Sequence, residues 1–379
     1  MALALNGIRI LDSANLYPGP YCSMLLGDLG AEIIKVERPG VGDAARGMPG
    51  FFRSINRNKK SITLDLKKTD AKKILYRLVK RSDVFTEGFR PGVSNRLGLG
   101  YDTLREINPG LVYCSISGYG QEGPYRDLPG HDINYLAMAG MLDEFKDNSG
   151  NIIPPSVAIG DLSSGMFAVI GILAALMARE RSGEGQYIDV SMFDGLVSWM
   201  STRLGGVFAN APIEAEYDAG YGVFTTSDGK AFTLGIALED WFWDRLCSAI
   251  DLDELQGLGP LERKNQRAAL VEKLQTVFSG KPRDEWIKIL SEADLPVAPV
   301  HTAKDVENDP HVIFRKMIQN ISLSSGDANK QVNFPIKLSG TPGEIRLPPP
   351  ELGEHNKDIL SWLEYSDEEI EIFRSKGVI

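Results

Sequence analysis

The chain has 379 residues, of which 43% are hydrophobic and 24% are charged, and its formal net charge is −10. This length favours two domains, and the acidic balance disfavours nucleic acid or an anionic membrane as a partner. The three cysteines are too far apart for a disulfide framework or a zinc site, and the first residues lack the basic start of a secretory signal. The longest apolar run, residues 166–177, is too short to span a bilayer. We therefore expect a cytoplasmic protein.

Short β-branched runs alternate with amphipathic segments through the first half of the chain. Strands are expected at residues 8–11, 33–36, 61–64, 84–87, 112–117 and 187–190. Helices are expected at residues 21–29, 70–80 and 163–181. The last of these helices is predicted to be capped by Asp161 or Ser163 and to end at Gly183. Such alternation predicts an α/β fold with a parallel sheet covered by helices.

The pattern changes after Trp199. Residues 223–226 and 231–237 flank a turn sequence and predict a β-hairpin, and helical patterns follow at residues 241–250, 261–279 and 283–293. A stretch rich in proline and glycine then leads to a final helix, with Ser366 and Glu369 as its capping box. We predict a large domain that begins with residues 1–200 and a smaller α+β domain at residues 201–325. Residues 326–379 are expected to return to the large domain as a linker and a C-terminal helix.

Three arginines follow predicted strands. Arg38 comes just after the strand at 33–36, and Arg90 and Arg96 come after the strand at 84–87. Open α/β sheets bind ligands at the carboxyl ends of their strands, and guanidinium groups suit phosphate or carboxylate. The sequence GYGQEG at residues 118–123 matches a dinucleotide-binding pattern, but prolines follow where that pattern requires a helix. These glycines instead predict a loop beside a site.

A histidine and an aspartate indicate chemistry at carbon. His131 directly follows Gly130 where a loop gives way to a helical pattern, and Asp161 stands at the mouth of the long apolar helix. Brought together in a cleft, the two side chains can both transfer protons, and the backbone N–H groups at the helix start can stabilise an oxyanion. Taken singly, each has a commoner role, as a helix cap for Asp161 and as a structural histidine for His131. Glu239, at a strand-to-helix junction, is ordinarily a cap as well.

Several motifs in order give the chain a family resemblance over nearly its whole length. They are GIRILD at 7–12, PGPYC at 18–22, GAEIIKVERPG at 30–40, NKKSITLDLK at 58–67, FRPGV at 89–93 and LGEH at 352–355. With these motifs the chain resembles the family III CoA-transferases (CaiB/BaiF) and, most closely, their racemase relatives, the α-methylacyl-CoA racemases. The resemblance implies a Rossmann-like large domain, a small domain and an interlocked homodimer. It also implies an acyl-CoA substrate, with no metal and no cofactor beyond the coenzyme A of that substrate.

The resemblance leaves two chemistries open. In the racemases, residues matching His131 and Asp161 exchange the α-proton of the acyl group, and one matching Glu239 partners the histidine. In the transferases, the residue matching Asp161 forms a mixed anhydride with the acyl group. The residues that the resemblance places around acyl-CoA are Arg38, Leu64, Lys67, Arg90, Arg96, Gly130, Asp132 and Tyr135.

Motif details favour the racemase. Residues 130–137 and 237–239 are similar to the racemase form, and no glycine-rich flap of the transferase type lies between residues 209 and 235. Residues 161–166 and 41–43 are more similar to the transferase form. We therefore predict a racemase that interconverts (R)- and (S)-2-methylacyl-CoA, with a CoA-transferase as the alternative. A non-catalytic CoA-binding subunit is the third and least favoured reading, because it has no need of His131, Asp161 and Glu239 together.

Overall fold

The structure is a computed structural model that describes residues 2–147, 149–210 and 218–379. The chain divides into two compact units, residues 1–204 with 315–379 and residues 205–314. The boundary expected after residue 200 falls near the first division, whereas the one expected after residue 325 lies beyond β10 (Ile318–Ser322), which belongs to the larger unit. Of the span expected to lack a glycine-rich flap, residues 211–217 lie outside the described residues.

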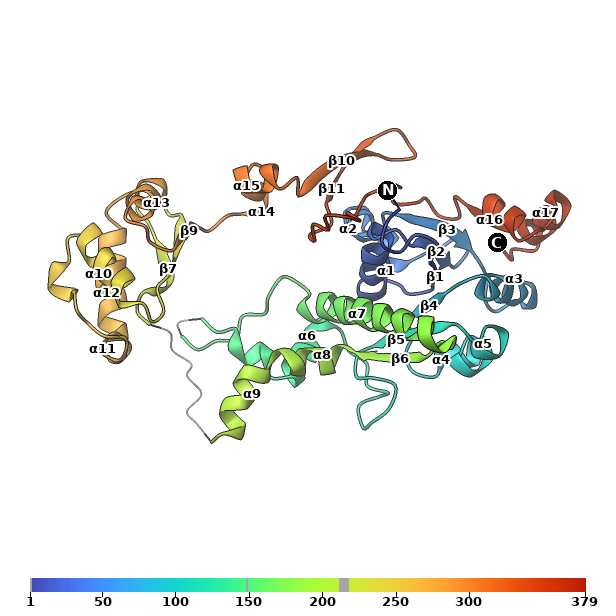
Figure 1. The fold of residues 1–379 in the computed structure, drawn as a ribbon, viewed down its shortest axis with the longest axis horizontal. Coiled ribbons are helices and arrows are strands. Elements are labelled where there is room, and N and C mark those ends of the chain that lie inside the picture. Colours follow the sequence, from blue (N-terminus) through green and yellow to red (C-terminus); the bar gives the residue numbers. More distant parts are fainter. Residues whose placement is uncertain (1, 148, 211–217) are drawn as a thin grey trace. The chain divides into compact units, whose positions relative to one another are not determined.

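A six-stranded parallel sheet forms the centre of the larger unit (Figure 1). Its strands are β1 (Arg9–Asp12), β2 (Glu32–Glu37), β3 (Lys59–Thr63), β4 (Val84–Glu87), β5 (Val112–Ser117) and β6 (Tyr187–Ser191). Their order is β3-β2-β1-β4-β5-β6, which is the order of a Rossmann sheet. All six predicted strands are confirmed, with β3 beginning at Lys59 rather than at residue 61.

Helices cover both faces of this sheet. On one face, alternate strand residues such as Leu11 and Ile34 pack with α3 (Thr69–Lys80), α5 (Tyr101–Ile107), α16 (Asn356–Trp362) and α17 (Asp367–Ser375). On the other face, Ile10 and Ile33 pack with α1 (Pro18–Asp28), α6 (Asp132–Met138), α7 (Ile159–Ser182) and α8 (Met192–Trp199). Because both faces are covered, apolar residues of the strands are buried on each of them.

The helix α7 differs from its prediction at the start. It begins at Ile159 rather than at residue 163, and Ala158 is its N-cap residue, without a side-chain hydrogen bond. The prediction that Asp161 or Ser163 caps this helix is therefore wrong, because both lie inside it. By length and composition alone α7 could cross a membrane, but Ala168, Ile172 and Ala175 are buried in the core of the larger unit. The predicted end at Gly183, which has φ +74°, is confirmed.

Several shorter elements complete the larger unit. They are η1 (Ala44–Gly47), α2 (Pro49–Ile55), α4 (Val93–Leu97), η2 (Met141–Glu144) and the hairpin of β10 (Ile318–Ser322) with β11 (Ala328–Val332), while α9 (Ser201–Phe208) spans the division between the units. The capping box of the final helix is confirmed, since Ser366 Oγ accepts from Glu369 N and Glu369 Oε2 accepts from Ser366 N. Helix α1 begins at Pro18, earlier than predicted, because proline is well suited to the first turn of a helix.

The smaller unit contains an antiparallel sheet of β7 (Tyr221–Thr225), β8 (Ala231–Gly235) and β9 (Val297–Pro299), and the predicted hairpin of β7 and β8 is confirmed. Its helices are α10 (Asp240–Ala249), η3 (Asp253–Leu255), α11 (Pro260–Asn265), α12 (Arg267–Phe278), α13 (Arg283–Glu292), α14 (Ala303–Val306) and α15 (Pro310–Phe314). The prediction of a single helix at residues 261–279 is wrong, because the helix is interrupted at Gln266, between α11 and α12. Helix α11 is tied down by Arg263, whose buried side chain pairs with Asp218 and Asp240.

Candidate functional site

The candidate site lies at the point where the strand order reverses. Strands β1 and β4 are neighbours at this switch point, and the chain leaves them in opposite directions along the sheet. Open α/β sheets bind ligands in the crevice outside the carboxyl ends of such strands. Two clefts are found there, of about 410 and 720 Å³, and both are lined by Asn15 and Leu16 after β1 and by Phe89 after β4. The shared lining makes them neighbouring compartments of one site.

The larger cleft brings together most of the predicted site residues. Asp161 enters from the first turn of α7, and His131 from the residue that precedes α6. The remaining predicted residues that line it are Arg90, Arg96, Gly130 and Tyr135. The smaller cleft contains three more, Arg38 directly after β2 and Leu64 and Lys67 after β3, whereas Asp132 and Glu239 line neither cleft. The strand-end argument thus placed the arginines at the correct edge of the sheet but did not separate the two clefts.

Asp161 has the most perturbed carboxyl group of the larger cleft. Its side chain is partly buried, and burial together with the nearby Asp132 raises its pKa to about 7. Both causes act in one direction, because low polarity and a second negative charge each disfavour the carboxylate. A carboxyl group that titrates near neutral pH is a candidate for either nucleophilic or acid–base chemistry.

Asp132 caps the helix that carries Asp161. Its Oδ1 accepts hydrogen bonds from the backbone N–H groups of Gly160 and Asp161, at 2.6 and 3.1 Å. A carboxylate at this position satisfies free N–H groups and interacts favourably with the helix dipole. The prediction that the first N–H groups of this helix stabilise an oxyanion is therefore wrong for these two groups. That Asp132 binds substrate stays a prediction.

The segment around His131 is held by its own helix and by a tyrosine. The backbone N–H of His131 donates to Asn134 Oδ1 at 3.0 Å. His131 is exposed and lines the larger cleft. The Tyr135 hydroxyl donates to the carbonyl oxygen of Gly130 at 2.6 Å, and burial raises the pKa of Tyr135 to about 12. Tyr135 thus fixes the turn that presents His131, and it stays a neutral donor at neutral pH.

Glu239 belongs to the smaller unit. It precedes α10, and its Oε2 accepts from the backbone N–H groups of Ala237 and Leu238, both at 3.0 Å. These hydrogen bonds lower the pKa of Glu239, since they stabilise its charged form. The carboxylate therefore organises its own turn, and a role as partner of His131 stays a prediction.

The glycine-rich loop at residues 118–123 lies beside the larger cleft, as its sequence predicted. A side-chain carbon on Gly118 would lie 2.5 Å from the ring of Tyr135, so only glycine allows this approach. Gly118 and Tyr119 line the larger cleft, and the next helix, α6, begins only at Asp132. The loop shapes the wall of the cleft rather than binding a dinucleotide.

Sequence reasoning missed several polar residues of the larger cleft, among them Asn15, Tyr17 and Arg126. Asn15 and Tyr17 follow β1, and Arg126 lies in the loop before α6. Their signal was their position after strands at the switch point, but no pattern within the sequence showed which strands are neighbours. Among residues 2–147, 149–210 and 218–379, no three His, Cys, Asp or Glu side chains are grouped so that they could hold a metal ion.

Comparison with known proteins decides the family. The profile of CoA-transferase family III matches residues 5–356. The chain belongs to this family. It is 33% identical to an acyl-CoA transferase of Fusarium pseudograminearum, over 99% of this chain and 88% of that protein. It is also 33% identical to the β subunit of succinyl-CoA–L-malate CoA-transferase of Chloroflexus aurantiacus, over 100% and 98%. Among solved structures, a CaiB/BaiF family protein from Brucella suis superposes with a TM-score of 0.87 at 30% identity, over 96% of this chain and 100% of that protein.

These findings confirm the family resemblance and the α/β fold with its six-stranded parallel sheet. The names of the relatives favour the transferase alternative over the predicted racemase. For this member of CoA-transferase family III, three expectations stay predictions. They are the interlocked homodimer, the cytoplasmic location and the use of no cofactor beyond the coenzyme A of the substrate.

Proposed function

We propose that this protein transfers coenzyme A between carboxylic acids through an acyl anhydride on Asp161. The observation that carries the proposal is the placement of Asp161, partly buried in the first turn of α7 and facing the larger cleft, in a chain of CoA-transferase family III. Its pKa is raised to about 7 by burial and by Asp132. A carboxylate with a raised pKa is more basic and less strongly solvated, and both properties favour nucleophilic attack.

The chemistry balances without any further reactant. The Asp161 carboxylate attacks the carbonyl carbon of the acyl-CoA thioester, the carbon–sulfur bond breaks, and CoA leaves as its thiolate. This step produces a mixed anhydride between Asp161 and the acyl group. The thiolate then attacks the Asp161 carbonyl carbon of the anhydride, the donor acid leaves as its carboxylate, and Asp161 becomes a CoA thioester. The acceptor carboxylate attacks this thioester and expels the thiolate, which gives a second mixed anhydride. The thiolate finally attacks the acyl carbon of the acceptor, so that the acceptor leaves as a CoA thioester and the Asp161 carboxylate is regenerated.

The two neighbouring clefts suit the two ends of an acyl-CoA. Arg38 and Lys67 in the smaller cleft provide positive charge for the phosphates of the nucleotide. The larger cleft contains Arg90, Arg96 and Arg126 together with Asp161. We assign these three guanidinium groups to carboxylates of the acyl group and the acceptor acid. For Arg90 and Arg96 this replaces the nucleotide that their strand-end positions suggested. The names of relatives that use succinyl-CoA and malate support acids with two carboxylates as substrates.

One observation favours racemisation as the second candidate. His131 and Asp161 line the same cleft, which is the arrangement that two-base proton exchange at an α-carbon requires. In this second reading Asp161 only carries a proton and forms no covalent bond.

A trapping experiment separates the two candidates. The protein is incubated with succinyl-CoA and hydroxylamine, and its peptides are analysed by mass spectrometry. Transfer predicts a hydroxamate at Asp161, absent in Asp161→Asn and retained in Asp127→Asn, which changes an exposed carboxylate of the same cleft. A parallel incubation with one enantiomer of a 2-methylacyl-CoA in heavy water follows α-deuterium. Deuterium uptake without any adduct at Asp161 would replace the transferase by the racemase.

A further inference from the structure

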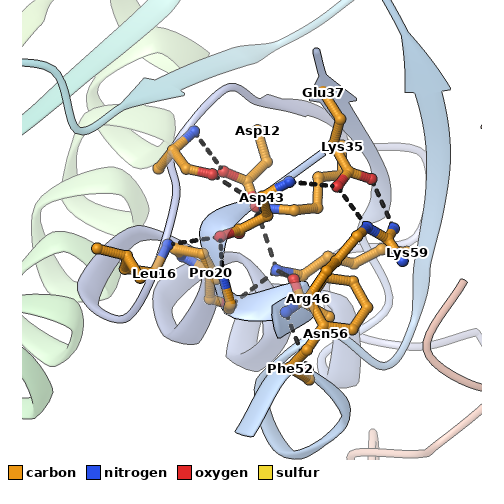
Figure 2. Close-up of polar contacts among 12 residues, drawn as sticks. Asp12, Leu16, Pro20, Lys35, Glu37, Asp43, Arg46, Phe52, Asn56 and Lys59 are labelled. Atoms are coloured by element: carbon orange, nitrogen blue, oxygen red, sulfur yellow. Dashed lines mark hydrogen bonds and ion pairs between the residues drawn. The ribbon is translucent and has the colours of Figure 1, made fainter. Parts of the chain in front are cut away.

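A cluster of buried charges lies beneath the loop that connects β1 to α1 (Figure 2). It consists of Asp12 at the end of β1, Lys35 in β2, Asp43 before η1 and Lys59 at the start of β3, and each of these residues is at most 1% exposed. Lys35 Nζ lies 2.8 Å from Asp43 Oδ2, and Lys59 Nζ lies 3.1 Å from Asp12 Oδ2. The cluster therefore contains two positive and two negative groups in contact.

Two members, Lys35 and Asp12, are held in their charged forms, whereas burial lowers the pKa of Lys59 to about 8 despite the nearby Asp12. Burial lowers the pKa of Lys35, but Asp12 and Asp43 outweigh burial and hold this pKa above its ordinary value. Burial likewise raises the pKa of Asp12, but Lys59 and Lys35 hold it below its ordinary value. Buried ion pairs add little to stability, because desolvation offsets their attraction, whereas they do fix geometry. A function in positioning is thus a better explanation for this cluster than a function in stability.

The cluster is bonded to the backbone of the β1–α1 loop on both sides. Lys35 Nζ donates to the carbonyl oxygen of Ala14 at 2.9 Å, and Asp12 Oδ1 accepts from Ala14 N at 3.0 Å. Asp43 Oδ1 accepts from Leu16 N at 2.9 Å. These three bonds leave the loop backbone little freedom.

The far side of the loop is held in the same way. Lys59 Nζ donates to the carbonyl oxygen of Pro20 at 2.8 Å, at the start of α1, and Asn56 Oδ1 accepts a further bond from it at 2.8 Å. Figure 2 shows dashed lines that join Leu16 to Asp43 and Pro20 to Lys59. The cluster thus grips the loop and the first turn of the helix that follows it.

The loop is in a conformation that it would not adopt alone. Leu16 has φ +63°, in the left-handed region that costs a residue with a side chain on the order of 1 kcal/mol. Such a conformation persists only when the surroundings determine it, and these regions concentrate at functional sites. The hydrogen bond from Leu16 N to Asp43 Oδ1 holds Leu16 in this conformation.

The restrained loop is part of the wall that faces Asp161. Asn15, Leu16 and Tyr17 line the larger cleft together with Asp161. Helix α1, which the loop begins, packs directly on α7, and a side-chain carbon on Gly165 would lie 2.9 Å from the carbonyl oxygen of Pro18. The position of the loop therefore sets the distance across the cleft to the first turn of α7.

We propose that Lys35, Asp43 and Lys59 are positioning residues for the acylation of Asp161, which they promote by clamping the β1–α1 loop across the cleft. The acylation step in this inference rests on the proposed function, whereas the clamping of the loop does not. Misplacing a cleft wall by about 1 Å can cost on the order of a hundredfold in rate, without loss of the distant contacts that bind the substrate.

The test compares Asp43→Ala with a matched buried pair. Asp28 and Arg57 form an ion pair of similar burial at the other end of α1, and their further side-chain hydrogen bonds go to Asn58 and Gln331 rather than to the β1–α1 loop. Asp28→Ala therefore removes a buried charge without touching the clamp. The third variant, Asp43→Asn, keeps an oxygen that can accept from Leu16 N, so it should retain part of the function. It also provides the comparison if Asp43→Ala does not fold.

Two readouts are measured on each variant, at a temperature well below its unfolding midpoint. The first is the rate of hydroxamate formation at Asp161 with saturating succinyl-CoA and hydroxylamine, and the second is amide hydrogen exchange of the peptide that contains Leu16. For Asp43→Ala we expect acylation roughly 10- to 100-fold slower, a much smaller change in KM, and faster exchange at the loop. Asp43→Asn should lie between this variant and the wild type. Asp28→Ala should change neither the acylation rate nor the exchange of the loop.

The outcomes separate the inference from the proposed function. If the wild-type protein forms no adduct, the proposed function fails, and loop exchange alone then decides whether the cluster clamps the loop. Unchanged exchange in both Asp43 variants would overturn the clamp whatever the chemistry. Equal loss of acylation in Asp28→Ala and Asp43→Ala would show a general effect of destabilisation and would also overturn it.

Discussion

The raised pKa of Asp161 predicts that its ionised carboxylate lowers the free energy of unfolding. The perturbation is Asp161→Asn, which keeps the shape of the side chain and removes its charge. Burial and Asp132 raise the pKa of Asp161 from 3.8 to about 7. The folded state therefore binds this proton more tightly than the unfolded state, and the free energy of unfolding falls as pH rises from about 4 through about 7. The asparagine variant has no such dependence.

The size of the effect follows from the shift. Three pKa units correspond to roughly 4 kcal/mol, and because solvent reaches part of the Asp161 side chain we reduce this to about 2 kcal/mol. At pH 8 the Asp161→Asn variant should be more stable than the wild type by this amount, whereas at pH 4 the two should be about equally stable. The midpoint of thermal unfolding should then rise by roughly 2–3 °C at pH 8.

Calorimetry at pH 4, 6 and 8 measures the effect. The control is Asp127→Asn, which removes an exposed carboxylate from the same cleft and should leave the midpoint unchanged at every pH. A midpoint for Asp161→Asn that shifts equally at pH 4 and pH 8 would refute the reasoning, because a raised pKa in the folded state requires the difference to grow with pH. The variant should also lose activity at all pH values, so that function and stability oppose each other at this residue.

Four further predictions concern Asp132, Arg38 and Glu87. Replacing Asp132 with alanine removes a negative charge beside Asp161 and should lower the pKa of Asp161, so that the acid limb of the pH–rate profile moves to lower pH; an unmoved limb would exclude Asp132 as a cause. The same variant loses the cap of α7 and should be destabilised by about 1 kcal/mol at pH 5, as urea unfolding measures. Arg38→Ala should raise the KM for acyl-CoA by the loss of one charge-assisted contact while kcat at saturation stays nearly constant, and steady-state kinetics that showed the reverse would remove Arg38 from the binding site. Burial raises the pKa of Glu87 to about 7, so stability falls as its proton is lost with rising pH, and Glu87→Gln should unfold at a higher temperature than the wild type at pH 8.5 but not at pH 5.

The sequence by itself determined the sheet strands, most of the helices and the family. Runs of β-branched residues between turn signals identify strands whatever their neighbours are, because both faces of a parallel sheet are buried. The motifs at residues 7–12, 30–40 and 58–67 determined the family in a similar way, since each contains a strand of the sheet, and the last two also include the start of the loop at its carboxyl end. His131 and Asp161 were found from their position beside helix starts, which is a local feature.

Only the tertiary structure decided which of these groups act together. The strand order places β1 beside β4, and this long-range pairing brings the loops with Asn15 and Phe89 into one site. Asp132 caps a helix that begins far along the chain, so no local pattern showed that the first N–H groups of α7 are occupied. The buried lysines, Lys35 and Lys59, lie in strands where sequence patterns predict apolar residues, and their carboxylate partners come from other elements. Charge pairing of this kind depends on distances between segments, which only the folded chain sets.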